Sequence, residues 1–182
     1  MTRQSELEWV KKAREYIGLR EIKGSRHDSV IIRMLEEMGK FSGEAKAWWR
    51  DDETPWCGLF VGWIMGKTGR YVVREWYRAK EWANPLLTKL NAPAYGCIAV
   101  LDRAGGGHVG FVVGVDARGN VMLLGGNQSD AVRIDAFAPS RITGFYWPSR
   151  WIDGKPMRSV PAVGRYDLPV LASDGTVSVN ES

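Results

Sequence analysis

The segment GCIAVLDRAGGGHVGFVVGVDARGNVMLLGGNQSDAVRIDAF, residues 96–137, decides the fold. Apolar residues recur along it with a period of two, which is the spacing of β-strands. The connection DARGN is typical of a hairpin turn between two such strands. Together with ITGFYW further on, the segment predicts five strands, at residues 96–103, 108–116, 120–125, 131–137 and 142–147. We therefore expect a run of consecutive antiparallel strands.

Before this segment the apolar spacing changes to that of helices. The clearest helix is TPWCGLFVGWIMGKTG, residues 54–69, in which Thr54 is expected to cap the helix and Pro55 to take its first position. Three further helices are predicted, at residues 4–18, 28–38 and 73–83. Helices followed by antiparallel strands predict an α+β fold, with N-terminal helices packed on a sheet of about five strands.

The composition excludes several classes of protein. A chain of 182 residues with 45% hydrophobic residues is one ordinary globular domain, which we place at residues 1–151, with a C-terminal tail at 152–182. Two histidines and two cysteines exclude a three-histidine metal centre and a four-thiolate zinc site, so we expect no metal and no cofactor. The net charge of +4 suits an acidic partner, although it also fits an ordinary solvated surface.

Cys57 and His108 are the candidate catalytic pair. Cys57 lies in the first turn of the predicted helix, where backbone N–H groups and the helix dipole stabilise a thiolate and lower the pKa of a thiol. His108 begins a predicted strand, and the small residues Gly110 and Gly114 on its face leave room for another element to approach the imidazole. A thiol beside an imidazole is the activated pair of cysteine hydrolases. The alternatives are a buried structural cysteine and a histidine bound to a loop.

Asn127 is the candidate for the group that orients the imidazole. It follows the strand after that of His108, and an antiparallel neighbour brings its far end back beside the start of the His108 strand. An amide oxygen there would accept the ring N–H, as in Cys-His-Asn arrangements. The alternative is a turn asparagine in a left-handed conformation. Cys97 begins a strand and is interpreted as a buried small residue.

Three segments together resemble a known family: DDETPWCGLFVGW, then residues 96–134, then ITGFYWP. They are similar to the CHAP/NlpC-type group of papain-like peptidoglycan hydrolases, and within it to small single-domain endolysin-like proteins of phages and prophages. The resemblance runs from about Trp9 to Pro148. It implies a papain-like fold, a nucleophilic cysteine matching Cys57, a general-base histidine matching His108 and a polar third residue matching Asn127.

This sequence departs from the pattern of that group in two places. Gly125 stands where many CHAP relatives have a glutamate, and the third-site histidine of many NlpC-type enzymes is absent. Candidate substrate-binding residues are two acidic residues for a stem-peptide ammonium, the aromatic residues of a groove, and the amide beside Asn127: Asp51, Asp52, Trp48, Trp49, Trp56 and Gln128. Solvated loop carboxylates, a second cap and packed tryptophans are the alternatives.

The resemblance implies hydrolysis of amide bonds in the cell-wall peptide, by an endopeptidase or an N-acetylmuramoyl-L-alanine amidase, in a phage or prophage endolysin. An amidase effector of a type VI secretion system and a non-catalytic wall-binding module are the alternatives. The expected partner is bacterial peptidoglycan, with an immunity or holin protein as a second one; we expect no nucleic acid, no membrane insertion and a monomer. No signal peptide is visible, so we expect synthesis in the bacterial cytoplasm and action in the periplasm or cell wall.

Overall fold

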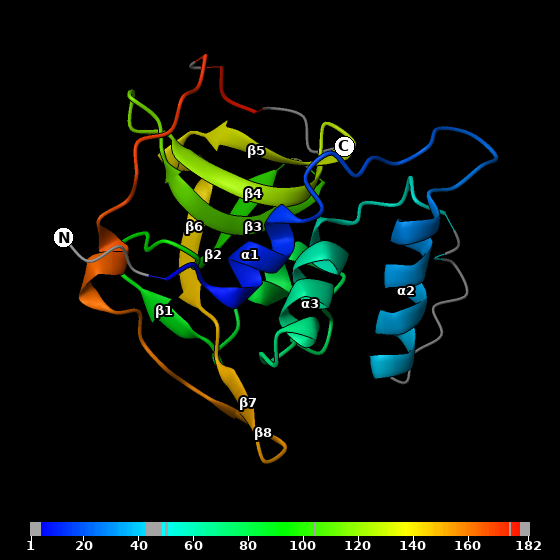
Figure 1. Cartoon of the computed structure of the whole chain (residues 1–182), viewed down its shortest axis with the longest axis horizontal. Helices are drawn as coiled ribbons and strands as arrows, with labels where there is room; N and C mark the ends of the chain where they lie inside the picture. Colours follow the sequence, from blue (N-terminus) through cyan, green and yellow to red (C-terminus); the bar gives the residue numbers. More distant parts are fainter. Residues whose placement is uncertain (1–4, 43–48, 50, 104, 175, 179–182) are drawn as a thin grey trace.

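The structure, a computed structural model, describes residues 5–42, 49, 51–103, 105–174 and 176–178. Its centre is a six-stranded sheet in the order β1-β6-β2-β3-β4-β5, in which all neighbours are antiparallel (Figure 1). Its strands are β1 (Thr88–Leu90), β2 (Ile98–Arg103), β3 (Gly106–Val115), β4 (Val121–Gln128), β5 (Ala131–Phe137) and β6 (Ile142–Trp147). The predicted α+β class is confirmed.

All five predicted strands form, and the bounds predicted for 131–137 and 142–147 agree with the structure. Strand β1 was not predicted, because three residues are too few to show an alternation. Strand β4 continues to Gln128, beyond the predicted end, after a register shift between Gly125 and Gln128. This extension brings Asn127 and Gln128 onto the sheet itself.

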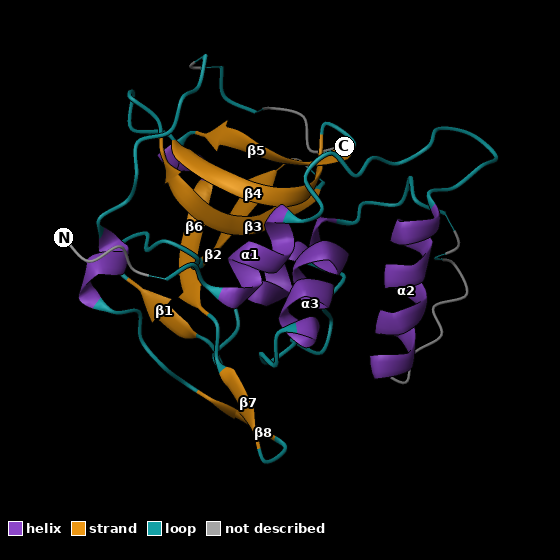
Figure 2. Ribbon diagram, viewed as in Figure 1, coloured by secondary structure: helices purple, strands orange, loops and turns teal. Residues whose placement is uncertain are grey.

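The described residues form three α-helices (Figure 2): α1 (Glu8–Arg14), α2 (Ser29–Ser42) and α3 (Cys57–Lys67). Helix α1 is shorter than predicted, and α2 continues past the predicted end at residue 38. Asp28 begins α2, because its Oδ1 accepts the backbone N–H groups of Val30 and Ile31 at 2.8 and 3.2 Å. No helix in the described part of the chain has the length and apolar character that crossing a bilayer requires.

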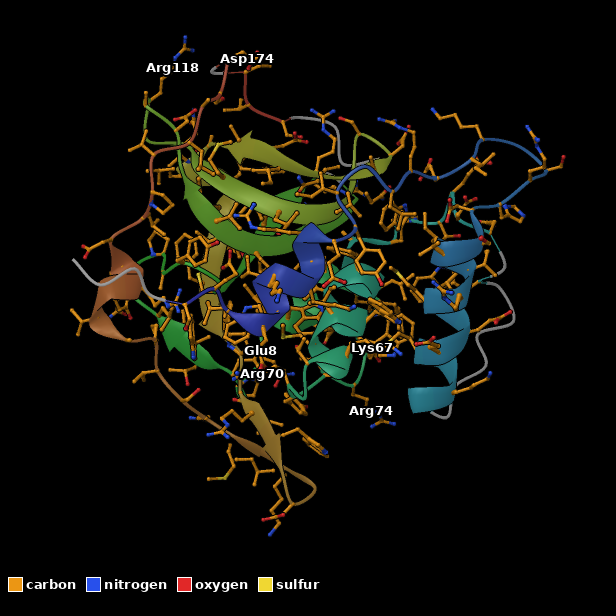
Figure 3. All side chains as sticks on the ribbon, in the orientation of Figure 1. Glu8, Lys67, Arg70, Arg74, Arg118 and Asp174 are labelled. Carbon is orange, nitrogen blue, oxygen red and sulfur yellow. The ribbon has the colours of Figure 1, made fainter. Side chains whose placement is uncertain are left out.

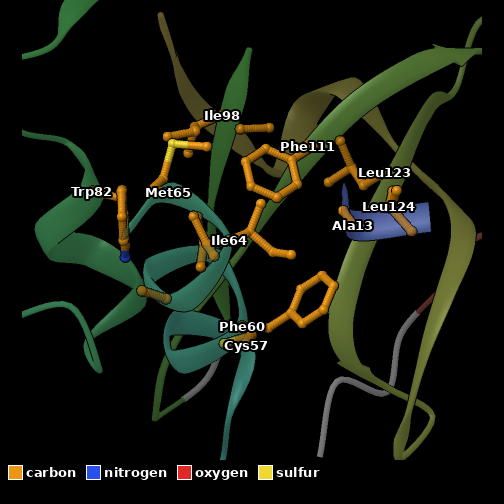
Figure 4. Packing of buried hydrophobic residues seen from close by; sticks show 14 of the residues in the cluster. Ala13, Cys57, Phe60, Ile64, Met65, Trp82, Ile98, Phe111, Leu123 and Leu124 are labelled. Carbon is orange, nitrogen blue, oxygen red and sulfur yellow. The ribbon is translucent and has the colours of Figure 1, made fainter. Parts of the chain in front are cut away.

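Helix α3 lies in the core (Figure 4). Strands β3 and β4 pack on it from one side and α1 and α2 also contact it, so that every residue from Cys57 to Met65 is buried. On another side, Gly58 lets the backbone of Trp76 and Tyr77 approach, since a Cβ at Gly58 would lie 2.6 Å from the carbonyl oxygen of Trp76. The helix that carries the candidate nucleophile is thus held firmly against the sheet.

The start of α3 differs from the prediction. Thr54 does not cap the helix, since the N-cap is Trp56 and the first helical residue is Cys57. The N–H and the hydroxyl of Thr54 both donate to Asp51 Oδ1, at 2.7 and 2.8 Å, and this contact closes a turn before the helix begins. Cys57 therefore lies even closer to the helix N-terminus than predicted.

The helix predicted at 73–83 is wrong. This segment forms a turn and then the short 3-10 helix η1 (Ala79–Trp82). Its buried residues, Val73, Trp76, Ala79 and Trp82, are three apart along the chain, which matches the three residues per turn of a 3-10 helix better than the 3.6 of an α-helix. Packing of this apolar series on α3 and the sheet overrides the helix propensity of the residues between.

The C-terminal residues pass from a hairpin to the edge of the main sheet. Strands β7 (Arg150–Ile152) and β8 (Lys155–Met157) form the hairpin. After the 3-10 helix η3 (Val163–Tyr166), the chain bridges to Val115 and then to Ala136 in parallel. Asp174 lies beside Arg118 of the β3–β4 turn (Figure 3). The described tail thus packs along β3 and β5, whereas its division from the domain at 151/152 stays a prediction.

Candidate active site

Cys57 is the first residue of α3 and lies next to the start of β3. Its side chain is buried, and the backbone N–H groups of Val109 and Gly58 lie close enough to its sulfur to lower the pKa of the thiol. Val109 is the residue directly after His108. The fold therefore joins the two candidate catalytic residues, which are 51 positions apart in the sequence, at one junction of helix and strand.

The pKa of the Cys57 thiol is shifted in the direction opposite to the expectation. Burial raises this pKa above its usual value, and the charge of Arg103 and the backbone N–H groups offset only part of the effect. The backbone N–H groups at the helix start do lower the pKa, as predicted, but desolvation of the thiolate raises it by more, so the expected net lowering does not occur. In the resting protein Cys57 is therefore a thiol at neutral pH.

His108 is fully buried on β3. Its Nε2 is 3.0 Å from Oε1 of Gln128, and its ring stacks on Phe137 with centroids 5.4 Å apart and an interplanar angle of 15°. The space beside Gly110 is used by Gln128, because a Cβ at Gly110 would lie 3.6 Å from that same Oε1. The imidazole is thus fixed on its face and at one ring nitrogen.

Asn127 and Gln128 differ from the expected arrangement. Asn127 adopts the left-handed conformation of the alternative interpretation, with φ 57°, and its buried amide has no hydrogen-bond partner among the described residues. The neighbouring Gln128, expected to contact substrate, is fully buried and contacts His108 instead. The register shift in β4 separates the two roles, since it turns one amide toward the imidazole and the other away from that contact.

The candidate substrate carboxylates both have partners within the protein. Asp51 Oδ1 holds the turn at Thr54. Asp52 is fully buried, and its carboxylate accepts the N–H groups of Ile22 and Asp28 and contacts His27 Nδ1 at 3.0 Å. Burial alone would raise the pKa of Asp52, but these hydrogen bonds lower it below its usual value. Asp52 is thus occupied internally, which does not match the expected contact with a substrate ammonium.

The candidate groove tryptophans are core residues where the structure describes them. Trp49 is buried and stacks on Trp76 at 4.9 Å, and Trp56 is buried with its Nε1 donating to Glu21 at 3.1 Å. Neither ring forms an open wall in this conformation, because each covers part of the interior around α3. Trp48 lies outside the described residues.

Sequence reasoning did not single out two charged residues at this site, Arg103 and Glu21. Arg103 ends β2 beside the glycine turn, and its charge stabilises the Cys57 thiolate. Burial raises the pKa of Glu21, although its hydrogen bond from Trp56 acts in the opposite direction. A cation at the strand end before the turn to His108 was a usable signal for Arg103, whereas nothing in the local pattern points to Glu21.

Cys97 fits its interpretation as a buried small residue. It is fully buried directly before β2, and burial raises its pKa to about 12. The sulfur accepts the backbone N–H of Ala94 at 3.4 Å. Both cysteines are reduced in the structure. Among the described residues, no cluster of three or more potential ligands could hold a metal ion.

Comparison with known proteins points to the CHAP domain. Residues 49–127, somewhat less than half of the chain, match the family model of the CHAP domain. CHAP domains are typically cysteine- and histidine-dependent amidohydrolases or peptidases, and the match supports a hydrolase with peptidoglycan as its substrate. Comparisons with curated proteins and with solved structures gave no significant match. The matched segment contains Cys57, His108 and Asn127.

Proposed function

We propose that this protein hydrolyses amide bonds in the peptide of peptidoglycan, with Cys57 as nucleophile and His108 as general base. One observation carries the proposal. Cys57, at the first position of α3, lies against the strand residue that follows His108, close enough for the backbone N–H of Val109 to lower the pKa of its thiol, and this junction lies within the segment that matches the CHAP domain.

The reaction starts from Cys57 as a thiol, because burial raises its pKa. As the Cys57 sulfur forms its bond to the carbonyl carbon of a stem-peptide amide, His108 takes the thiol proton. His108 then gives this proton to the amine as the C–N bond breaks, which leaves a thioester on Cys57. His108 next removes a proton from water, whose oxygen attacks the thioester and releases the carboxylic acid. The proton returns to the sulfur, so the enzyme ends as it began. The positive charge of Arg103 favours every step in which the sulfur carries negative charge.

We further propose which bond is cut and which biological role the protein has. The bond cut is between stem amino acids or between muramic acid and L-alanine, and the biological role is that of a phage or prophage endolysin that acts on the cell wall from the periplasmic side. A type VI effector amidase would use the same catalytic pair. An immunity protein that binds over Cys57 would distinguish the effector from the endolysin, because an endolysin that is held back by a membrane needs no such inhibitor.

Digestion of purified sacculi tests the proposal. Wild-type protein and Cys57→Ala are incubated with Gram-negative sacculi and with one cross-bridged Gram-positive type, and the released fragments are identified by mass. Release by wild type alone supports the hydrolase, and the fragment masses name the bond. Cys97→Ala is the matched control and should release fragments as wild type does. Binding of both proteins to the wall without release contradicts the proposal and indicates a binding module, while release by both contradicts the assignment of Cys57.

A further inference from the structure

We propose that Gln128 is the positioning residue of this site and that it holds His108 by a neutral amide. The inference rests on the proposed function, in which His108 is the general base. Gln128 Oε1 lies 3.0 Å from His108 Nε2, and both side chains are fully buried. Water therefore does not compete for this hydrogen bond, and the orientation of the ring depends on it.

The strands fix which end of the Gln128 amide faces the imidazole. Gln128 Nε2 donates to the backbone oxygen of Leu123 at 3.1 Å and to that of Arg133 at 3.0 Å. Both partners are acceptors only, so the NH2 group must point to them and Oε1 must point to His108. An acceptor at Nε2 places the ring proton on this nitrogen and leaves the lone pair on Nδ1. The amide thus selects the tautomer whose Nδ1 can take a proton from a thiol.

Glycines make the space for this arrangement. A Cβ at Gly125 would lie closer than 3.0 Å to Gln128 Oε1, which is closer than real Cβ atoms approach other heavy atoms. It would also lie 3.1 Å from Gln128 Cδ and 3.4 Å from His108 Nε2. A side chain at position 125 and the amide of Gln128 therefore exclude each other. Gln128 can place its amide beside His108 because residue 125 is a glycine.

Charge distinguishes this site from one that uses a carboxylate. An amide oxygen accepts the ring N–H without a negative charge, so it stabilises a protonated imidazole less than a carboxylate would. The Cys57 thiol is also buried, and burial raises its pKa. The raised pKa keeps Cys57 as a thiol at rest, so its proton moves to the imidazole only as the sulfur attacks. Gln128 would then act through the tautomer and orientation of His108, without forming an ion pair.

Two substitutions separate the acceptor from the volume of the side chain. Gln128→Met keeps the length but removes the acceptor, and we expect kcat to fall about 10- to 100-fold, less than the full contribution of about 100- to 10,000-fold of a general base, because His108 itself remains, with little change in KM. Gln128→Glu keeps an acceptor and adds a charge, so it should recover part of kcat. Ser149→Ala, which removes a different buried hydrogen bond, to the oxygen of Leu86, controls for lost stability and should keep the wild-type kcat.

A second measurement needs no peptidoglycan. Alkylation of Cys57 by iodoacetamide is followed by mass against pH, with the buried Cys97 as internal reference. Relative to wild type, Gln128→Met should slow alkylation of Cys57 at neutral pH, and Gln128→Glu should move the alkylation profile to lower pH. Urea unfolding of each variant confirms that the protein is folded during the measurement.

The outcomes separate this inference from the proposed function. Wild-type kcat and an unchanged alkylation profile in Gln128→Met overturn the role of Gln128. A larger loss of kcat in Asn127→Gly than in Gln128→Met overturns it as well and assigns the role to Asn127. If wild type releases no fragments from sacculi, the proposed function fails, while the alkylation profiles still decide whether Gln128 controls the Cys57–His108 pair.

Discussion

Replacing Gly125 by alanine should inactivate the protein without unfolding it. The backbone of Gly125 does not need the left-handed region, so alanine is tolerated there on conformational grounds. The added Cβ would instead displace Gln128 Oε1, which is held from behind by two hydrogen bonds to backbone oxygens. The contact between Gln128 and His108, now 3.0 Å, is then the one that breaks.

The cost can be estimated from these contacts. A buried donor left without its acceptor costs about 1–3 kcal/mol, and one extra methyl in a packed site costs about 1–3 kcal/mol. Alanine also lowers the backbone entropy of the unfolded chain, which stabilises the folded protein by about 0.4–1 kcal/mol. The net loss is then about 1–6 kcal/mol, centred on about 3 kcal/mol, which leaves most proteins of stability about 5–15 kcal/mol folded, so a 10-fold or greater fall in kcat in a protein shown to be folded would report the site and not unfolding.

Urea unfolding and fragment release from sacculi, measured on the same preparation, test this prediction. Gly66→Ala is the control, because its Cβ would make only an ordinary 3.7 Å contact with Val72 and it should stabilise α3 by about 0.5–1 kcal/mol at unchanged kcat. In a Gln128→Ala background, Gly125→Ala should cost little further activity, since the displaced amide is gone. Wild-type kcat in a folded Gly125→Ala protein would refute the reasoning.

Three further predictions follow from the packing. Asp52→Asn should lower the free energy of unfolding at pH 7 by about 2–4 kcal/mol in urea titrations, because a neutral amide cannot serve three donors. Since the folded-state pKa of Asp52 is lowered, its stabilisation is complete above the usual carboxyl range and is lost as pH falls below about 4, where variant and wild type should converge. Cys97, with a pKa of about 12, should resist iodoacetamide at pH 9 in the folded protein, and rapid labelling there would contradict its burial. Gly114→Ala, whose Cβ would lie 2.5 Å from the oxygen of Pro169, should displace the tail from β3, which limited proteolysis after residue 158 would detect as faster cleavage.

Much of the fold could be predicted from local patterns. Strands β5 and β6 have the predicted bounds because alternation of apolar residues over six or seven positions is unambiguous. Cys57 was correctly expected in the first turn of a helix from the apolar spacing that follows it, although Pro55, predicted as the first helical residue, lies before the helix, which begins at Cys57. The α-helix predicted for residues 73–83 does not form. An apolar spacing of three fits both an α-helix and a 3-10 helix, and only contact with α3 selects the 3-10 helix.

The sequence by itself determined the α+β class, the succession of helices before antiparallel strands, and the position of Cys57 in the first turn of a helix, whereas the pairing of Cys57 with His108 stays a prediction. These features depend on neighbours within a few positions, where backbone geometry links spacing to structure. Only the tertiary structure decided that Gln128 and not Asn127 contacts His108, that Asp52 is an internal acceptor, and that the pKa of Cys57 is raised. These properties depend on desolvation and on atoms brought together from distant segments, and a one-residue change of register in β4 is enough to exchange the two amides.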